Sequence, residues 1–117
     1  RSVTGTGRLI AVFQPYLYTR TQAFAAQFGA ALALADEAVV MEIAVNREDP
    51  IPGVTGRLIA EQVGLPPDQV LFAPDWPGTA RSVVDRTRPG DVVVLLGSGP
   101  VYQLAPEILA LLKERSQ

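Results

Sequence analysis

Four short apolar runs constrain the fold of this chain most strongly. They span residues 9–13, 38–43, 70–72 and 92–96, and each is followed by a polar loop and then by a segment of helical period. Three runs are continuous rather than alternating, which is typical of strands covered by helices on both faces. Strands that alternate with helices through right-handed crossovers form a parallel sheet. The sequence therefore predicts an α/β fold: a three-layer, Rossmann-like domain with a mainly parallel sheet of about four to six strands.

Capping residues and apolar spacing predict four helices. Thr21 is expected to cap the first, whose core-facing stripe would consist of Phe24, Phe28, Ala31, Leu32 and Ala35. Thr55 is expected to cap the second, and residues 76–78 to open the third. The fourth would begin near Ala105, with Pro106 in its first turn.

The 117 residues, 48 % of them hydrophobic, suffice for one compact core, because a chain of this size buries roughly two-thirds of its unfolded surface. No internal repeat or linker divides the sequence, so residues 1–117 are predicted to form a single domain. The first residue is Arg1 rather than Met, and we expect the chain to be a piece of a longer protein.

The sequence contains no histidine and no cysteine. It therefore lacks the commonest general base, thiol nucleophiles, disulfides and the ligands of structural zinc sites. Chemistry must rest on carboxylates, Arg, Tyr, Ser, Thr and backbone amides. No catalytic residue and no metal site is predicted.

Charge and hydropathy exclude two classes of partner. Ten basic residues, spread along the chain, stand against twelve acidic ones, and the formal net charge is −2; this balance does not suit a nucleic-acid footprint. The longest apolar stretch without a formal charge, residues 23–35, is too short to span a bilayer, and the polar start has no signal-peptide pattern. We expect a cytoplasmic protein that binds neither nucleic acid nor membranes.

In open α/β sheets, ligands bind outside the carboxyl ends of the strands. Four loops follow the predicted strands, at residues 14–20, 44–54, 73–76 and 97–102. The first contains Tyr16, Tyr18, Thr19 and Arg20 just ahead of the expected helix, where backbone amides and the helix dipole favour an anion. Arg20 would hold a carboxylate or phosphate bidentately. The alternative is that the aromatic residues pack the loop onto the sheet while Arg20 is solvated.

The second loop begins with charged residues and continues with two prolines that restrict its backbone. Pro50 and Pro52 fix the backbone ahead of Gly53, which permits a positive φ, and Glu48 or Asp49 would be presented in one direction toward a ligand. A solvated turn with a local ion pair from Arg47 is the alternative. Neither carboxylate has an evident acidic partner, so a paired acid/base site is not indicated.

The third and fourth loops give weaker signals. Gly97-Ser98-Gly99 either lets backbone amides approach an anion or makes a tight turn, and it fits neither a P-loop nor a dinucleotide-binding fingerprint. Asp75 and Trp76 would rim a ligand, or Trp76 would be part of the core.

Taken in order, these segments resemble the C-terminal domain of a Mur ligase. The residues that carry the likeness are Q-P-x-x-Y-T-R-T at 14–21, R-E-x-P-I-P-G-V at 47–54 and Gly97-Ser98-Gly99, and they extend over nearly the whole chain. The first motif is similar to that of the family member that joins L-alanine to UDP-N-acetylmuramic acid.

The resemblance implies a function for a three-domain parent. Its first domain would bind the UDP-sugar, and its central domain would bind ATP and magnesium. The third, represented here, would close over the ATP site and receive the amino acid. The parent would phosphorylate the lactyl carboxylate of UDP-N-acetylmuramic acid, and the amine of L-alanine would attack the acyl phosphate. The upstream domains are absent from this chain, so the isolated domain is expected to be inactive.

The resemblance also implies roles for single residues. Arg20 would face the carboxylate of the amino acid, with Tyr16, Tyr18 and Thr19 beside it. The residues expected to shape the interdomain cleft are Glu48, Pro50, Gly53, Gly97, Ser98 and Gly99. Tyr16 stands where the family usually has His, and Leu17 stands where it often has a first Arg. Alanine binding would therefore be weaker or organised through Tyr16. Pro100 replaces a usual Asp or Asn.

Two alternatives remain at this point. The chain is also compatible with a stand-alone ligand-binding or interaction module, because a fold alone does not define a function. The related ligase that recycles murein peptides is a nearer alternative, although that enzyme is expected to lack Q-P-x-x-Y-T-R-T.

Overall fold

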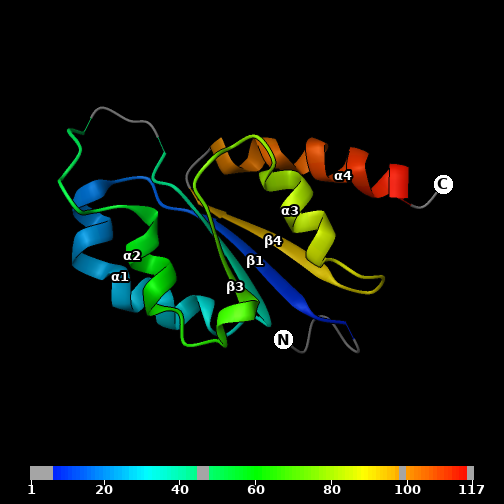
Figure 1. Ribbon diagram of the computed structural model, residues 1–117, viewed down its shortest axis with the longest axis horizontal. Coiled ribbons are helices and arrows are strands. Elements are labelled where there is room, and N and C mark those ends of the chain that lie inside the picture. The colour runs from blue at the N-terminus through cyan, green and yellow to red at the C-terminus, as the bar shows by residue number, and fades with distance from the viewer. Residues whose placement is uncertain (1–6, 45–47, 98–99, 116–117) are drawn as a thin grey trace.

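The computed structural model describes residues 7–44, 48–97 and 100–115. In chain order its elements are β1 (Leu9–Gln14), α1 (Tyr18–Leu32), β2 (Glu37–Met41), α2 (Gly56–Gln62), η2 (Pro67–Gln69), β3 (Val70–Ala73), α3 (Thr79–Arg86), β4 (Val92–Gly97), η3 (Pro100–Gln103) and α4 (Leu104–Arg115). Strands and α-helices alternate, as the sequence predicted (Figure 1).

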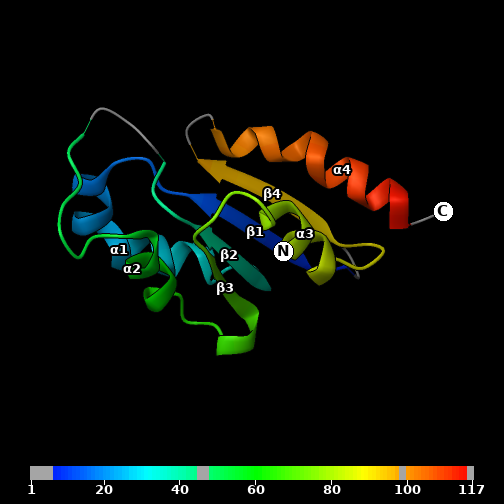
Figure 2. The same ribbon diagram turned by 45° about the horizontal axis from the view of Figure 1, so that its top comes forward.

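The described strands form one sheet in the order β3-β2-β1-β4, and every neighbouring pair is parallel. From β1 the chain moves outward through β2 to β3, and then crosses back to place β4 on the other side of β1 (Figure 2). The strand order therefore reverses between β1 and β4. This topological switch point is where open α/β sheets hold their ligands.

Helices cover both faces of the sheet, which confirms the predicted three-layer α/β fold. Val12 and Val39 pack with α3 and α4 on one face. Ala11, Ala38 and Val40 pack with α1 and α2 on the other (Figure 1). Successive strand residues point to opposite faces, so continuous apolar runs supply both halves of the core.

Helix α1 differs from the prediction at its start. It begins at Tyr18, so Thr21 is not its cap: the Thr21 hydroxyl lies inside the first turns and donates to the Leu17 carbonyl at 2.7 Å. Non-helical angles at Phe24 kink the helix and turn this ring outward, 47 % exposed. Ala31 is also exposed, and the buried face of α1 instead includes Gly29. The predicted stripe was wrong at Phe24 and Ala31 because the helix neither starts where expected nor stays straight.

The other predicted helix starts agree better with the structure. Thr55 caps α2, and its side chain accepts from the backbone N–H of Arg57 at 3.2 Å. Gly78 precedes α3 with a φ of 92°, a conformation that favours glycine. Pro106 lies in the first turn of α4.

β4, the most apolar strand, lies at a sheet edge and is only partly buried, so its continuous apolar run did not indicate that helices cover both of its faces.

A charged network joins the amino ends of three strands, opposite the loops that bear the predicted site. Arg8 pairs with Glu37 and, at 2.9 Å, with Asp91, and Arg86 pairs with Glu37 at 2.6 Å. Burial acts to raise the pKa of Asp91, but hydrogen bonds from the backbone N–H groups of Arg8 and Arg88 and from the Arg8 guanidinium outweigh it. The pKa of Asp91 therefore lies below its usual range.

Candidate functional site

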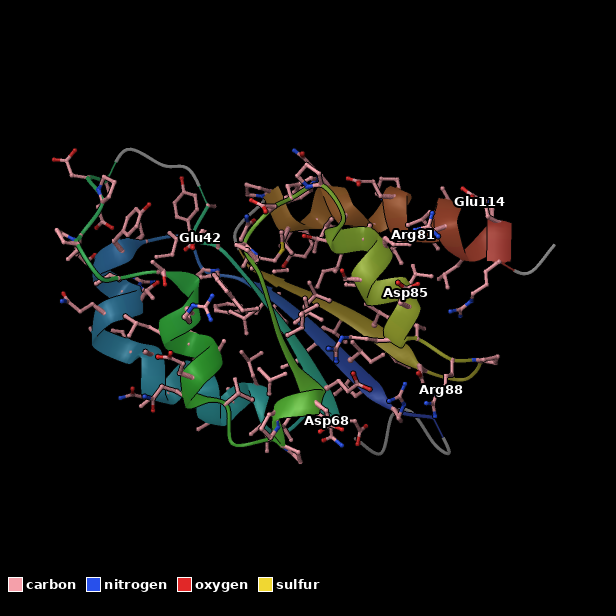
Figure 3. The ribbon with its side chains drawn as sticks, viewed as in Figure 1. Glu42, Asp68, Arg81, Asp85, Arg88 and Glu114 are labelled. Atoms are coloured by element: carbon pink, nitrogen blue, oxygen red, sulfur yellow. The ribbon has the colours of Figure 1, made fainter. Side chains whose placement is uncertain are left out.

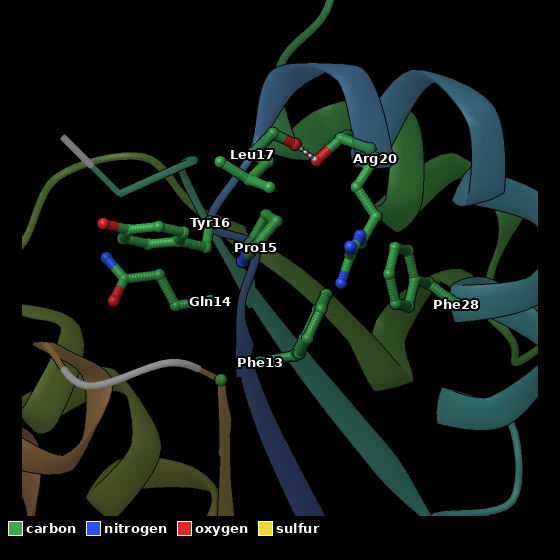
Figure 4. Close-up of a pocket in the computed structure, with 9 residues that line it drawn as sticks. Phe13, Gln14, Pro15, Tyr16, Leu17, Arg20 and Phe28 are labelled. Carbon is green, nitrogen blue, oxygen red and sulfur yellow. Dashed lines mark hydrogen bonds between the residues drawn. The ribbon is translucent and has the colours of Figure 1, made fainter. Parts of the chain in front are cut away.

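A cavity of about 190 Å³ lies at the carboxyl ends of β1 and β4, at the switch point of the sheet (Figure 4). Its lining residues are Phe13, Gln14, Pro15, Tyr16, Leu17, Arg20, Thr21, Phe28 and Gly97. The walls are mainly apolar, with one cation and one carboxamide among them. This composition is typical of a small-molecule site.

Arg20 supplies the cation of this cavity from the first turn of α1. Its guanidinium points toward the rings of Phe13 and Phe28, whose centroids are 5.2 Å apart (Figure 4). Within the described part of the chain, no carboxylate or carbonyl accepts a hydrogen bond from it. A guanidinium has five N–H donors in a planar fork, so this one is available to an incoming carboxylate.

Glu48 occupies the N-terminus of α1. Its Oε1 accepts from the backbone N–H groups of Tyr18 and, at 3.1 Å, of Thr19, and its Oε2 accepts from the Thr19 hydroxyl at 2.6 Å. The hydrogen bond from the Thr19 hydroxyl has the largest effect on the pKa of Glu48 and lowers it. The two backbone amides lower it further, and together they outweigh the opposing effect of desolvation. The Glu48 carboxylate therefore fills the anion site at the start of α1. A carboxylate from outside the protein would bind Arg20 instead of these backbone amides.

The four predicted substrate-binding residues therefore divide into two pairs. Arg20 and Tyr16 line the cavity. Tyr18 and Thr19 lie beside it and bind Glu48. The sequence did not indicate this hydrogen-bonded contact between the start of α1 and a loop about thirty residues away.

Glu42 accepts a backbone hydrogen bond at the N-terminus of α2, as Glu48 does at the N-terminus of α1. It follows β2 directly, and its Oε2 accepts from the backbone N–H of Gly56 at 2.7 Å, at the start of α2 (Figure 3). It also accepts from Ile43 at 2.9 Å. Carboxylates of the protein itself therefore occupy the N-termini of both helices on this face, where a nucleotide phosphate would otherwise find backbone donors.

The residues predicted to shape the cleft lie in several places. Glu48 holds α1, whereas Pro50 and Gly53 are exposed, and Gly53 has the positive φ, 80°, that the sequence suggested. Gly97 lines the cavity with a φ of 149°, and a Cβ there would lie 2.8 Å from the carbonyl oxygen of Gln14. Ser98, Gly99 and Arg47 lie outside the described residues.

A second cavity, of about 380 Å³, lies on the α3/α4 side of the same sheet edge. Trp76 is part of its wall and also packs against the core, and its indole N–H donates to Glu107 at 3.1 Å. Asp75 lies outside this wall and is exposed. Gln14 borders both cavities. Sequence reasoning did not select Gln14, although a polar residue at the end of an apolar strand is a usable signal.

The described residues form neither a metal-binding cluster nor a membrane-spanning helix. They contain no group of three or more acidic, His or Cys side chains placed to hold a metal ion. None of their helices has the length and apolar character needed to cross a membrane.

Comparisons with known proteins agree with the resemblance seen in the sequence. A family model described as Mur ligase, glutamate ligase domain, matches residues 1–99. A UDP-N-acetylmuramate--L-alanine ligase of Kineococcus radiotolerans is 51 % identical over 115 residues, covering 98 % of this chain and 24 % of that protein. Proteins of the same name in Saccharopolyspora erythraea and Mycobacterium sp. (strain JLS) are 50 % and 49 % identical, each over 99 % of this chain and 24 % of the relative. The chain thus spans about a quarter of the length of these relatives.

Proposed function

Because this chain belongs to the Mur ligase family, we propose that it is the amino-acid-receiving domain of an ATP-dependent ligase that joins L-alanine to UDP-N-acetylmuramic acid. The proposal rests on the family match and on the names of relatives that are about 50 % identical. A stand-alone binding module receives no support from these comparisons. A murein-recycling ligase receives none either, since the relatives are named for L-alanine.

One observation carries the assignment of the site: the Arg20 guanidinium faces a small, mainly apolar cavity and has no anion from the described residues. A small amino acid matches both features, because its carboxylate pairs with the guanidinium and its short side chain lies against apolar walls. Tyr16, at the mouth of the cavity and 39 % exposed, completes the wall where the family usually has His.

In this proposal the domain contributes positioning and electrostatic stabilisation rather than acid/base chemistry. No carboxylate of the described residues lines the cavity, so no general base is assigned within it. Closure of the domain over its partner domain would bring the amine of L-alanine to the acyl phosphate and exclude water.

ATP and magnesium belong to the proposed parent, and we propose no site for them among the described residues of this domain. Glu48 and Glu42 occupy the helix N-termini that a phosphate would use, and the described residues contain no metal-binding cluster. We assign nucleotide and metal binding to the domains outside this chain. The proposed setting is the cytoplasm, where UDP-linked precursors would be handled, with intramolecular contact between domains.

Kinetics of the full-length ligase test this proposal. Arg20→Ala is expected to raise the KM for L-alanine by roughly 10- to 100-fold, the effect of losing hydrogen bonds to a charged group, and to leave the KM for ATP unchanged. Arg81→Ala is the matched control, because Arg81 is exposed on α3, away from the cavity (Figure 3). An unchanged KM for L-alanine in Arg20→Ala would refute the assignment of the site. Absence of L-alanine-dependent ADP formation by the unaltered enzyme would refute the function.

A further inference from the structure

Two aromatic rings lie beside the Arg20 guanidinium in the first cavity. Phe13 comes from β1 and Phe28 from α1, and both line the 190 Å³ cavity. Their ring centroids are 5.2 Å apart and their planes are inclined by 38°, within the range that aromatic pairs favour. The guanidinium points toward both rings (Figure 4). A ligand whose carboxylate pairs with Arg20 therefore lies next to this aromatic pair.

The aromatic pair is held in place by the core. Both rings pack against the buried cluster on the α1/α2 side of the sheet, which includes Leu32, Val40 and Ile59. One ring is attached to a strand and the other to a helix, and side chains on such elements are positioned more precisely than those on loops. The pair thus forms a fixed wall, and a fixed wall can discriminate between ligands by size.

The volume of the cavity matches a small amino acid. A cavity of about 150 Å³ holds benzene, which has six non-hydrogen atoms. Alanine also has six, so a cavity of about 190 Å³ accommodates it and little more. Larger amino acids would need space that the two rings occupy.

The proposed reaction restricts how the amino acid lies in this cavity. Its carboxylate pairs with Arg20, and its amine must face the open side, from which the partner domain would supply the acyl phosphate. The side chain is then left to face the walls beside the guanidinium. Those walls are apolar and include both rings.

We propose that Phe13 and Phe28 determine the size of the amino-acid side chain that the ligase accepts. The inference rests on the proposed function and deepens it, because it restricts the substrate class to amino acids with a very short side chain. The rings leave room for the methyl group of alanine beside Arg20 and exclude side chains that are longer by a methylene group or more. They determine specificity without touching the reacting atoms.

The test compares L-alanine with L-2-aminobutyrate, which has one more methylene group, as substrates of the full-length ligase. One methylene group changes the discrimination of an apolar pocket by roughly 10- to 200-fold, so the unaltered enzyme is expected to prefer L-alanine in kcat/KM by a factor in this range. Phe28→Leu and Phe13→Leu replace a ring by a shorter side chain. Each is expected to raise the ratio of kcat/KM for L-2-aminobutyrate to that for L-alanine about tenfold.

The ratio of two kcat/KM values measured on one preparation does not depend on the fraction of enzyme that is folded. Partial unfolding of a variant therefore does not imitate the expected result. Phe24→Leu is the matched control, because it makes the same substitution on the same helix at a ring that is 47 % exposed and does not line the cavity. It should leave the ratio unchanged.

A tenfold rise in either Phe28→Leu or Phe13→Leu, without a rise in Phe24→Leu, supports the inference. Ratios in both variants equal to that of Phe24→Leu would overturn it, and so would an unaltered ligase that uses L-2-aminobutyrate as well as L-alanine. A ligase that does not use L-alanine at all would instead contradict the proposed function.

Discussion

Glu48 and Thr19 join the loop between β2 and α2 to the first turn of α1, far from it in the sequence. The Thr19 hydroxyl donates to Oε2 of Glu48 at 2.6 Å, and the Thr19 backbone N–H donates to Oε1 at 3.1 Å. Arg20 is the next residue in the same helical turn. The connection between β2 and α2 therefore fixes the first turn of α1, and with it the starting point of the Arg20 side chain.

Replacing Glu48 tests this relationship. Glu48→Ala removes the acceptor of two backbone amides and is expected to lower the Tm by roughly a few degrees, as the loss of a helix cap does. Glu61→Ala, at an exposed position of α2, is the control and should leave the Tm nearly unchanged. Thermal unfolding followed by circular dichroism measures both. Equal Tm values for the two variants would show that the contact does not stabilise α1.

The stability of the fold should decrease in acid. Both Glu48 and Asp91 have a pKa in the folded protein below that in the unfolded chain. The unfolded chain therefore binds more protons as the pH falls, so the stabilisation is complete above about pH 5 and is lost as the pH drops through the folded pKa values. Urea unfolding at pH 7, 5 and 3 measures the change. Asp91→Asn should show a smaller loss between pH 5 and 3; an equal loss would contradict the assignment to Asp91.

Arg8 is expected to be important for folding and not for ligand binding. Arg8→Leu leaves the Glu37 and Asp91 side chains, which are 11 % and 3 % exposed, without a shared cation. The expected decrease in the free energy of unfolding is about 2 kcal/mol, below the full cost of breaking a buried pair because Arg8 itself is partly exposed. Chemical denaturation measures it, with the exposed Arg81→Leu as control. A decrease no larger than that of Arg81→Leu would show that the network is not stabilising.

Gly97 is expected to tolerate no side chain. Gly97→Ala places a Cβ 2.8 Å from the carbonyl oxygen of Gln14, at a φ of 149°. The expected decrease in the free energy of unfolding is about 2 kcal/mol. Gly64→Ala, where a Cβ meets nothing within 4 Å, should change it by less than about 1 kcal/mol. Parallel urea titrations compare the two, and similar midpoints would indicate that β1 and β4 can separate at this point.

The pattern of apolar runs predicted much of the fold. It located all four described strands and the α/β class, because continuous apolar strands between amphipathic segments can bury both faces only in a layered parallel sheet. Thr55 was recognised as a cap because its hydrogen bond is local, two residues along the chain. The start of α1 was misplaced because its carboxylate partner, Glu48, lies almost thirty residues away.

What the sequence by itself determined is therefore the layered fold, the loops at the carboxyl edge and the family motifs that contain Arg20 and Glu48. Only the tertiary structure decided which loops meet. The strand order β3-β2-β1-β4 places the switch point between β1 and β4 and brings Gln14, Gly97 and Arg20 to one cavity. The physical reason is that periodicity reports which face of an element is buried, whereas strand order and the contacts between loops depend on packing between residues distant along the chain.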